Sequence, residues 1–94
     1  MPYSLAFLES AKKEWDDLPS SIQKHLKVKL FKVIEHPHIP KNKLVGLKNC
    51  YKIKLRASGY RLVYRVYDDR IVVQIVAIGK RDKSAIYRTA HQRL

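Results

Sequence analysis

From Cys50 to Arg65 the chain reads CYKIKLRASGYRLVYR, and this pattern predicts much of its architecture. It consists of two alternating runs of cationic and apolar residues around the short connection 57–59. Successive side chains of a β-strand point to opposite faces of a sheet, so the alternation predicts two strands. The first strand places three cations on a single face, and these are Lys52, Lys54 and Arg56. Such a concentration of like charge is unfavourable unless an anionic partner binds the face.

The strand pattern continues toward the C-terminus. We expect strands over about Cys50–Arg56, Tyr60–Tyr67 and Ile71–Gly79, and their short connections favour an antiparallel meander. Residues 71–78 are nearly all apolar, which is typical of a central strand covered on both faces. The second connection contains Asp68 and Asp69, where aspartate favours turn geometry, so we do not interpret them as a paired-carboxylate site.

The N-terminal part predicts one strand followed by two helices. Tyr3–Phe7 is a short apolar run that we interpret as a strand. Apolar residues then recur at helical spacing in two segments that are separated by Pro19. Ser20 and Gln23 have the spacing of a capping box, which predicts that they cap the second helix. A short helix is expected from about Ser84 to the end of the chain.

These elements predict an α+β fold in a single domain over residues 1–94. We expect a small, mainly antiparallel four-stranded sheet, with an N-terminal helical hairpin on one face and a short C-terminal helix. The single cysteine, Cys50, cannot form an internal disulfide, which fits a reducing cytoplasm. No segment resembles a signal peptide or a membrane span, so we expect a cytoplasmic protein without a membrane partner.

The charge is strongly positive and unevenly distributed. The formal net charge is +12, with 20 Lys and Arg against 8 Asp and Glu. Residues 1–40 carry six lysines and five acids, whereas residues 41–94 carry fourteen Lys and Arg and three acids. A basic excess confined to one part of a small domain indicates a polyanionic partner, most often nucleic acid.

The candidate site lies on the charged sheet face. We expect five residues to converge there, and they are Lys52, Lys54, Arg61, Arg81 and Tyr87. Further cations are predicted to contact RNA, namely Lys43, Lys48, Arg56, Arg65, Lys80 and Lys83. Cations beside an aromatic ring are suited to holding a phosphate and stacking a base. From spacing alone, the face binds RNA, and whether it also cuts RNA is left open.

Cleavage through attack by a ribose 2′-hydroxyl requires a base, neutralisation of phosphorane charge and a proton for the leaving 5′-oxygen. A lysine serves as base when like charges and partial burial lower its pKa. Lys52 and Lys54 are crowded by Arg56 and Arg61, which favours this role. The four histidines lack companions at metal-ligand spacing, and we predict no metal and no cofactor. Three tyrosines are interpreted as packing residues, namely Tyr51, Tyr60 and Tyr64.

The chain resembles the RelE toxins of bacterial toxin–antitoxin systems over nearly its whole length. The segments that carry the resemblance are Lys12–Trp15, Lys43–Leu44, Gly46–Leu47, Cys50–Arg56, Ser58–Tyr64, Gly79–Arg81 and a following tyrosine. The strings YKIKLR and SGYRLVY are specific to this pattern. One position departs from it, because the family often has an arginine where this chain has Val45.

The resemblance implies a ribosome-dependent messenger-RNA endonuclease that cuts the codon in the decoding A site and leaves 2′,3′-cyclic phosphate and 5′-hydroxyl ends. It assigns base and phosphate contacts to Lys52 and Lys54, transition-state stabilisation to Arg61, the general acid to Arg81 and stacking on the codon to Tyr87. It also implies a RelB-type antitoxin that wraps the toxin and displaces the C-terminal helix. Two alternatives stay open: a ParE-like toxin that inhibits gyrase, and an RNA-binding module without catalysis.

Overall fold

The computed structural model describes residues 2–80 and 85–94. The elements in chain order are β1 (Ser4–Phe7), α1 (Glu9–Asp16), α2 (Ser20–Val33), the 3₁₀ turn η1 (Pro40–Asn42), β2 (Cys50–Lys54), β3 (Tyr60–Tyr67), β4 (Val72–Lys80) and α3 (Ala85–Arg93). The predicted α+β class is confirmed, with each predicted strand and helix in its expected place. No helix in the described part of the chain has the length and apolar character needed to cross a bilayer.

The four strands form one sheet in the order β1-β4-β3-β2. The meander β2-β3-β4 is antiparallel, as the short connections predict, and β1 pairs with β4 in parallel. The apolar segment that begins at Ile71 therefore does lie at the centre of the sheet. Because β2 forms one edge of the sheet, long side chains on β2 can reach past that edge.

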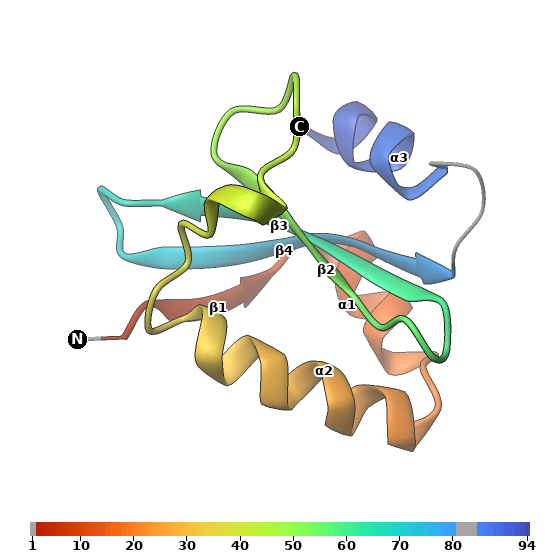
Figure 1. Cartoon of the computed structure of the whole chain (residues 1–94). Helices are drawn as coiled ribbons and strands as arrows, with labels where there is room; N and C mark the ends of the chain where they lie inside the picture. Colours follow the sequence, from red (N-terminus) through yellow and green to blue (C-terminus); the bar gives the residue numbers. More distant parts are fainter. Residues whose placement is uncertain (1, 81–84) are drawn as a thin grey trace.

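Helices cover both faces of the sheet, α1 and α2 on one face and α3 on the other (Figure 1). The larger core, under α1 and α2, includes Trp15, Leu26 and Tyr64. The smaller core, under α3, consists of Cys50, Val63, Val76, Ala77, Ile86 and Ala90. Tyr51 and Tyr64 are buried, and Tyr60 packs against the larger core, so the three tyrosines are packing residues as predicted.

A bulge in β4 contributes to the surface on which α3 packs. Val63 pairs with Ala77 and the next residue, Tyr64, pairs with Ile75, so Val76 is an extra residue in β4. A bulge of this kind interrupts the alternation of side chains. It allows both Val76 and Ala77 to pack into the smaller core below α3.

The predicted capping box of α2 is wrong. Pro19 occupies the N-cap position, and no side chain caps the helix. Gln23 instead donates from Nε2 to the backbone oxygen of Trp15 at 2.8 Å, which ties α2 to α1. Proline is already suited to a helix start because it has no N–H to satisfy. The strand predicted over Cys50–Arg56 is shorter than expected, since β2 ends at Lys54.

A partly buried ion pair attaches α3 to the rest of the fold. Arg93 donates to both carboxylate oxygens of Glu14, at 2.8 and 3.0 Å, and to the backbone oxygen of Val76 at 2.8 Å. Glu14 also accepts the backbone N–H of Ile78 at 3.1 Å. Since β1 pairs only with residues 72–75 of β4, these contacts satisfy backbone groups beyond the end of β1.

We expect Glu14→Ala to lower the free energy of unfolding by about 1–3 kcal/mol, because it leaves partly buried donors of Ile78 and Arg93 unpaired. Asp16→Ala is the matched control, since its ion pair with Lys12 is exposed, and it should cost less than about 0.5 kcal/mol. Urea unfolding of both variants measures the difference. Equal losses would show that the Glu14 contacts do not stabilise the fold.

Candidate active site

The register of β2 against β3 gathers the predicted cations on the α3 side of the sheet. Lys54 lies directly opposite Arg61, and Lys52 lies opposite Val63, which is in the smaller core under α3. Residues opposite each other in a ladder share a face. Lys52, Lys54 and Arg61 therefore lie together, as the alternation predicted, and we call this surface the cationic face.

Tyr87 of α3 borders the cationic face. Arg61 donates from Nη1 to the Tyr87 hydroxyl oxygen at 3.3 Å, and its Cζ lies 5.8 Å from the centroid of the Tyr87 ring. Ile86 and Ala90 on the same helix are buried against the sheet, so packing of α3 determines where the ring lies. A half-buried arginine beside an aromatic ring offers hydrogen-bond donors for a phosphate next to a stacking platform.

No carboxylate of the described residues forms an ion pair with the cationic face. The ion pairs found in the described residues are Lys12–Asp16, His38–Asp68, Asp69–Arg70 and Glu14–Arg93, none of which involves this face. The positive charge of Lys52 is the largest cause that lowers the pKa of Lys54, followed by desolvation and the charge of Arg61. Lys54 thus has a larger neutral fraction than an ordinary lysine.

The other predicted cations of β3 and β4 lie on opposite faces of the sheet. Arg65 is on the same side of the sheet, opposite Cys50, with its Cζ 5.0 Å from the ring centroid of Tyr67. Lys80 pairs with Tyr60, which packs into the larger core, so Lys80 belongs to the opposite face. Its ammonium lies 5.5 Å from the centroid of the Tyr60 ring.

Three predicted cations lie on loops, and two predicted residues are outside the described part of the chain. Lys43 and Lys48 belong to the loop that precedes β2, where Lys43 forms an isolated bridge with Tyr51. Arg56 follows β2 and is exposed. Arg81 and Lys83 lie outside the described residues, so the structure describes four of the five predicted catalytic residues.

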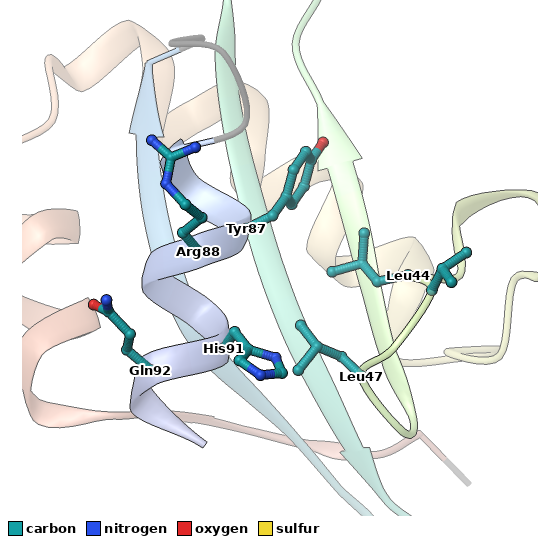
Figure 2. Close-up of a pocket in the computed structure, with 7 residues that line it drawn as sticks. Leu44, Leu47, Tyr87, Arg88, His91 and Gln92 are labelled. Atoms are coloured by element: carbon teal, nitrogen blue, oxygen red, sulfur yellow. The ribbon is translucent and has the colours of Figure 1, made fainter.

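A pocket beside Tyr87 is a feature that no sequence pattern predicted. It has a volume of about 560 Å³ and lies between α3 and the loop before β2. Figure 2 shows Leu44 and Leu47 projecting from that loop toward Tyr87 and His91. The fully exposed Val45 also lines it, at the position where the resembling family often has arginine. The sequence prediction used only the lysines of this loop. Its apolar residues Leu44, Val45 and Leu47 were a signal that the loop could line a pocket.

Charge and contacts together fit binding of a phosphodiester next to an unstacked base. The described residues contain no group of three or more His, Cys, Asp or Glu that could hold a metal ion. His38, which lies in the loop after α2, instead contacts the Tyr51 hydroxyl at 2.7 Å and the Asp68 carboxylate at 2.8 Å. The titratable side chains that the described residues place on or beside the centre of the cationic face are Lys52, Lys54, Arg61 and Tyr87.

Comparison with known proteins gives consistent results. A family model for the ParE toxin of the type II toxin–antitoxin system parDE matches residues 5–85. The mRNA interferase toxin RelE of Escherichia coli (strain K12) is 51% identical over 94 residues, covering 100% of this chain and 99% of the relative.

Solved structures extend the match to three dimensions. A mutant of the E. coli toxin RelE in the free state has a TM-score of 0.92 and 50% identity, covering 100% of this chain and 99% of that chain. The toxin of the intact E. coli RelBE toxin–antitoxin complex has a TM-score of 0.83 and 52% identity, covering 86% of this chain and 99% of that chain. With half of its residues identical over the full length, the chain belongs to the RelE toxins, within the ParE-type toxin family of type II toxin–antitoxin systems.

Proposed function

We propose that this RelE toxin is an endoribonuclease that enters the ribosomal A site and cuts the messenger codon there. The observation that carries the proposal is the cationic face, where Lys52, Lys54 and Arg61 meet Tyr87 without a neutralising carboxylate from the described residues. The name of the E. coli relative, mRNA interferase, supports the same activity. The products are a 2′,3′-cyclic phosphate and a 5′-hydroxyl.

Each residue of the site is proposed to have one role. Lys54 removes the proton of the 2′-hydroxyl, because its pKa is lowered by its cationic neighbours. Lys52 contacts the phosphate, and Arg61 stabilises the charge that develops on the phosphorane oxygens. Tyr87 stacks on a base of the codon and orients it. Arg81 donates the proton to the leaving oxygen; this role rests on the sequence resemblance.

The ribosome supplies the substrate alignment that this site does not provide by itself. Lysine and arginine are a weak acid–base pair at neutral pH. Such a site gains most when an external scaffold holds the 2′-oxygen in line with the scissile bond. Ribosomes also place the activity in the cytoplasm, and the net charge of +12 favours association with ribosomal RNA.

Neutralisation by a RelB-type antitoxin is part of the proposal. The E. coli relative forms a RelBE toxin–antitoxin complex. In this chain the hydroxyl of Tyr87 contacts Arg61 only while α3 is packed on the sheet through Ile86 and Ala90. An antitoxin that displaces α3 would separate Tyr87 from the cationic face and cover the lysines.

A translation extract tests the function directly. Purified toxin should cut messenger within codons when ribosomes translate it, and leave the same RNA intact when ribosomes are omitted. Equal cutting of naked RNA would contradict the ribosome requirement. A gyrase supercoiling assay run in parallel separates the ParE-like alternative, for which we expect no inhibition. RNA binding without new 5′ ends would instead identify a non-catalytic module.

We expect Tyr87→Ala to lower kcat/KM by about ten- to a hundredfold, because one base–aromatic stack is worth about 1–3 kcal/mol. Tyr87→Phe retains the ring and loses only the hydroxyl contact with Arg61, so its loss should be several times smaller. Rates on programmed ribosomes measure both variants. If the two variants lose activity equally, the hydroxyl matters and stacking does not.

A further inference from the structure

A second concentration of positive charge lies around the free edge of β2. A groove of about 600 Å³ is lined there by six cations from four parts of the chain, namely Lys29, Lys32, Lys41, Lys52, Lys54 and Arg56. No carboxylate occurs among the described residues that line it. Its remaining lining is Asn42 and the apolar side chains of Val33, Ile39 and Ile53. Like charges held this closely favour an anionic occupant.

The groove extends from the catalytic centre to the other side of the sheet and shares two residues with that centre. Lys29 and Lys32 come from α2, and Lys41 comes from η1, so this part lies on the α2 side of the sheet. Arg61 and Tyr87 lie on the α3 side and do not line the groove. Lys52 and Lys54 belong to both surfaces because they are on an edge strand.

The lining of the groove distinguishes between kinds of anion. Proteins that bind unstacked single strands use aromatic rings as stacking platforms. No aromatic residue lines this groove, whereas Tyr87 borders the cationic face. A set of ammonium groups without an aromatic ring fits the sugar–phosphate backbone of folded RNA, whose bases are already paired.

We propose that the groove along the edge of β2 docks the backbone of ribosomal RNA, while the cationic face holds the message. This inference rests on the proposed function and adds to it a second contact surface with a different RNA. Strand β2 then lies between two RNAs, and Lys52 and Lys54 are held in place by both. Docking through the groove fixes the position of the catalytic lysines relative to the codon, which gives the ribosome requirement a structural basis.

A pair of charge-matched variants tests the inference. The groove variant is Lys29→Gln with Lys32→Gln and Lys41→Gln. The control is Lys13→Gln with Lys24→Gln and Lys27→Gln, whose lysines are exposed and do not line the groove. Both lower the net charge by three, from +12 to +9. The readout is the dissociation constant for vacant ribosomes, without message, over a range of salt concentrations.

The groove variant should lose at least about tenfold in affinity, and its slope of log K against log salt should fall by about two to three. The control should lose less than about threefold. Equal losses in the two variants would overturn the inference, because only net charge would then matter. The inference also fails if the groove variant keeps its affinity for vacant ribosomes and loses affinity only for single-stranded RNA or only for the antitoxin.

This readout is independent of cutting. If wild-type toxin cuts codons on ribosomes but the two variants bind vacant ribosomes equally, the groove inference fails and the proposed function stands. If wild-type toxin does not cut messenger on ribosomes, the proposed function itself fails.

Discussion

Arg61→Ala is expected to slow codon cleavage on the ribosome by about 100- to 1,000-fold, the usual cost of removing a charged donor aimed at a developing oxyanion. Arg61 lies directly opposite Lys54 in the sheet and contacts the hydroxyl of Tyr87, so it is central to the cationic face. In the proposed mechanism its guanidinium contacts the phosphorane oxygens, which carry more charge in the transition state than in the ground state. Binding to ribosomes should therefore change little.

Single-turnover rates with toxin in excess over programmed ribosomes measure this effect, and a binding assay on the same ribosomes measures affinity. Arg70→Ala is the matched control, since Arg70 is exposed in the β3–β4 connection with its Cζ 5.0 Å from the ring centroid of Tyr67. It should cut at nearly the wild-type rate. Normal cutting by Arg61→Ala would show that the transition-state role belongs to another residue.

Lys54→Ala is expected to slow cleavage by about 100- to 10,000-fold, the range for removal of a general base. A base works in its neutral form, so the wild-type rate should rise with pH until Lys54 is deprotonated. The charge of Lys52 is the largest cause of the lowered pKa of Lys54. Lys52→Gln removes that charge, so the rising part of its pH–rate profile should move to higher pH.

The pH–rate profiles of wild type and Lys52→Gln distinguish a base from a simple phosphate contact. Lys13→Gln removes one positive charge from α1, far along the chain from the site, and its profile should coincide with that of wild type. An unshifted profile in Lys52→Gln would mean that the titration of Lys54 does not limit the rate. The base would then have to be sought elsewhere on the cationic face.

The fold was largely predictable because most local sequence patterns in this chain are compatible with only one type of secondary structure. Alternation in β2 and β3 predicted which side chains share a face, and the register confirms it for Lys52, Lys54 and Arg61. The continuous apolar run from Ile71 predicted a central strand. The helical spacing around Pro19 predicted the two N-terminal helices and the break between them.

What the sequence did not predict depends on contacts between distant residues. The pairing of Glu14 with Arg93 spans 79 positions, and neither residue carries a local signal for it. The extra residue Val76 in β4 cannot be recognised within an apolar run, because every neighbour is also apolar. Ile71 has a φ of 55°, a conformation that its β-branched side chain disfavours and that no propensity rule anticipates.

The sequence predicted the candidate site as a set of residues and less so as an arrangement. Spacing placed Lys52 and Lys54 side by side, yet it gave no reason to prefer one as the base. The structure favours Lys54 through its opposite neighbour Arg61 and its lowered pKa. The groove beside β2 joins α2, η1 and β2, so its lysines are far apart in sequence and did not stand out as one surface.

The chemical nature of the new RNA ends distinguishes 2′-hydroxyl attack on the cationic face from other routes of cleavage. A defined message on purified ribosomes, with its A site vacant, is incubated with wild-type toxin or with Arg61→Ala, and both new ends are analysed. We predict that the wild type produces a cut inside the A-site codon with a 2′,3′-cyclic phosphate and a 5′-hydroxyl, and that Arg61→Ala produces almost none. A 5′-phosphate end, or equal cutting by the two proteins, would contradict cleavage by 2′-hydroxyl attack on the cationic face.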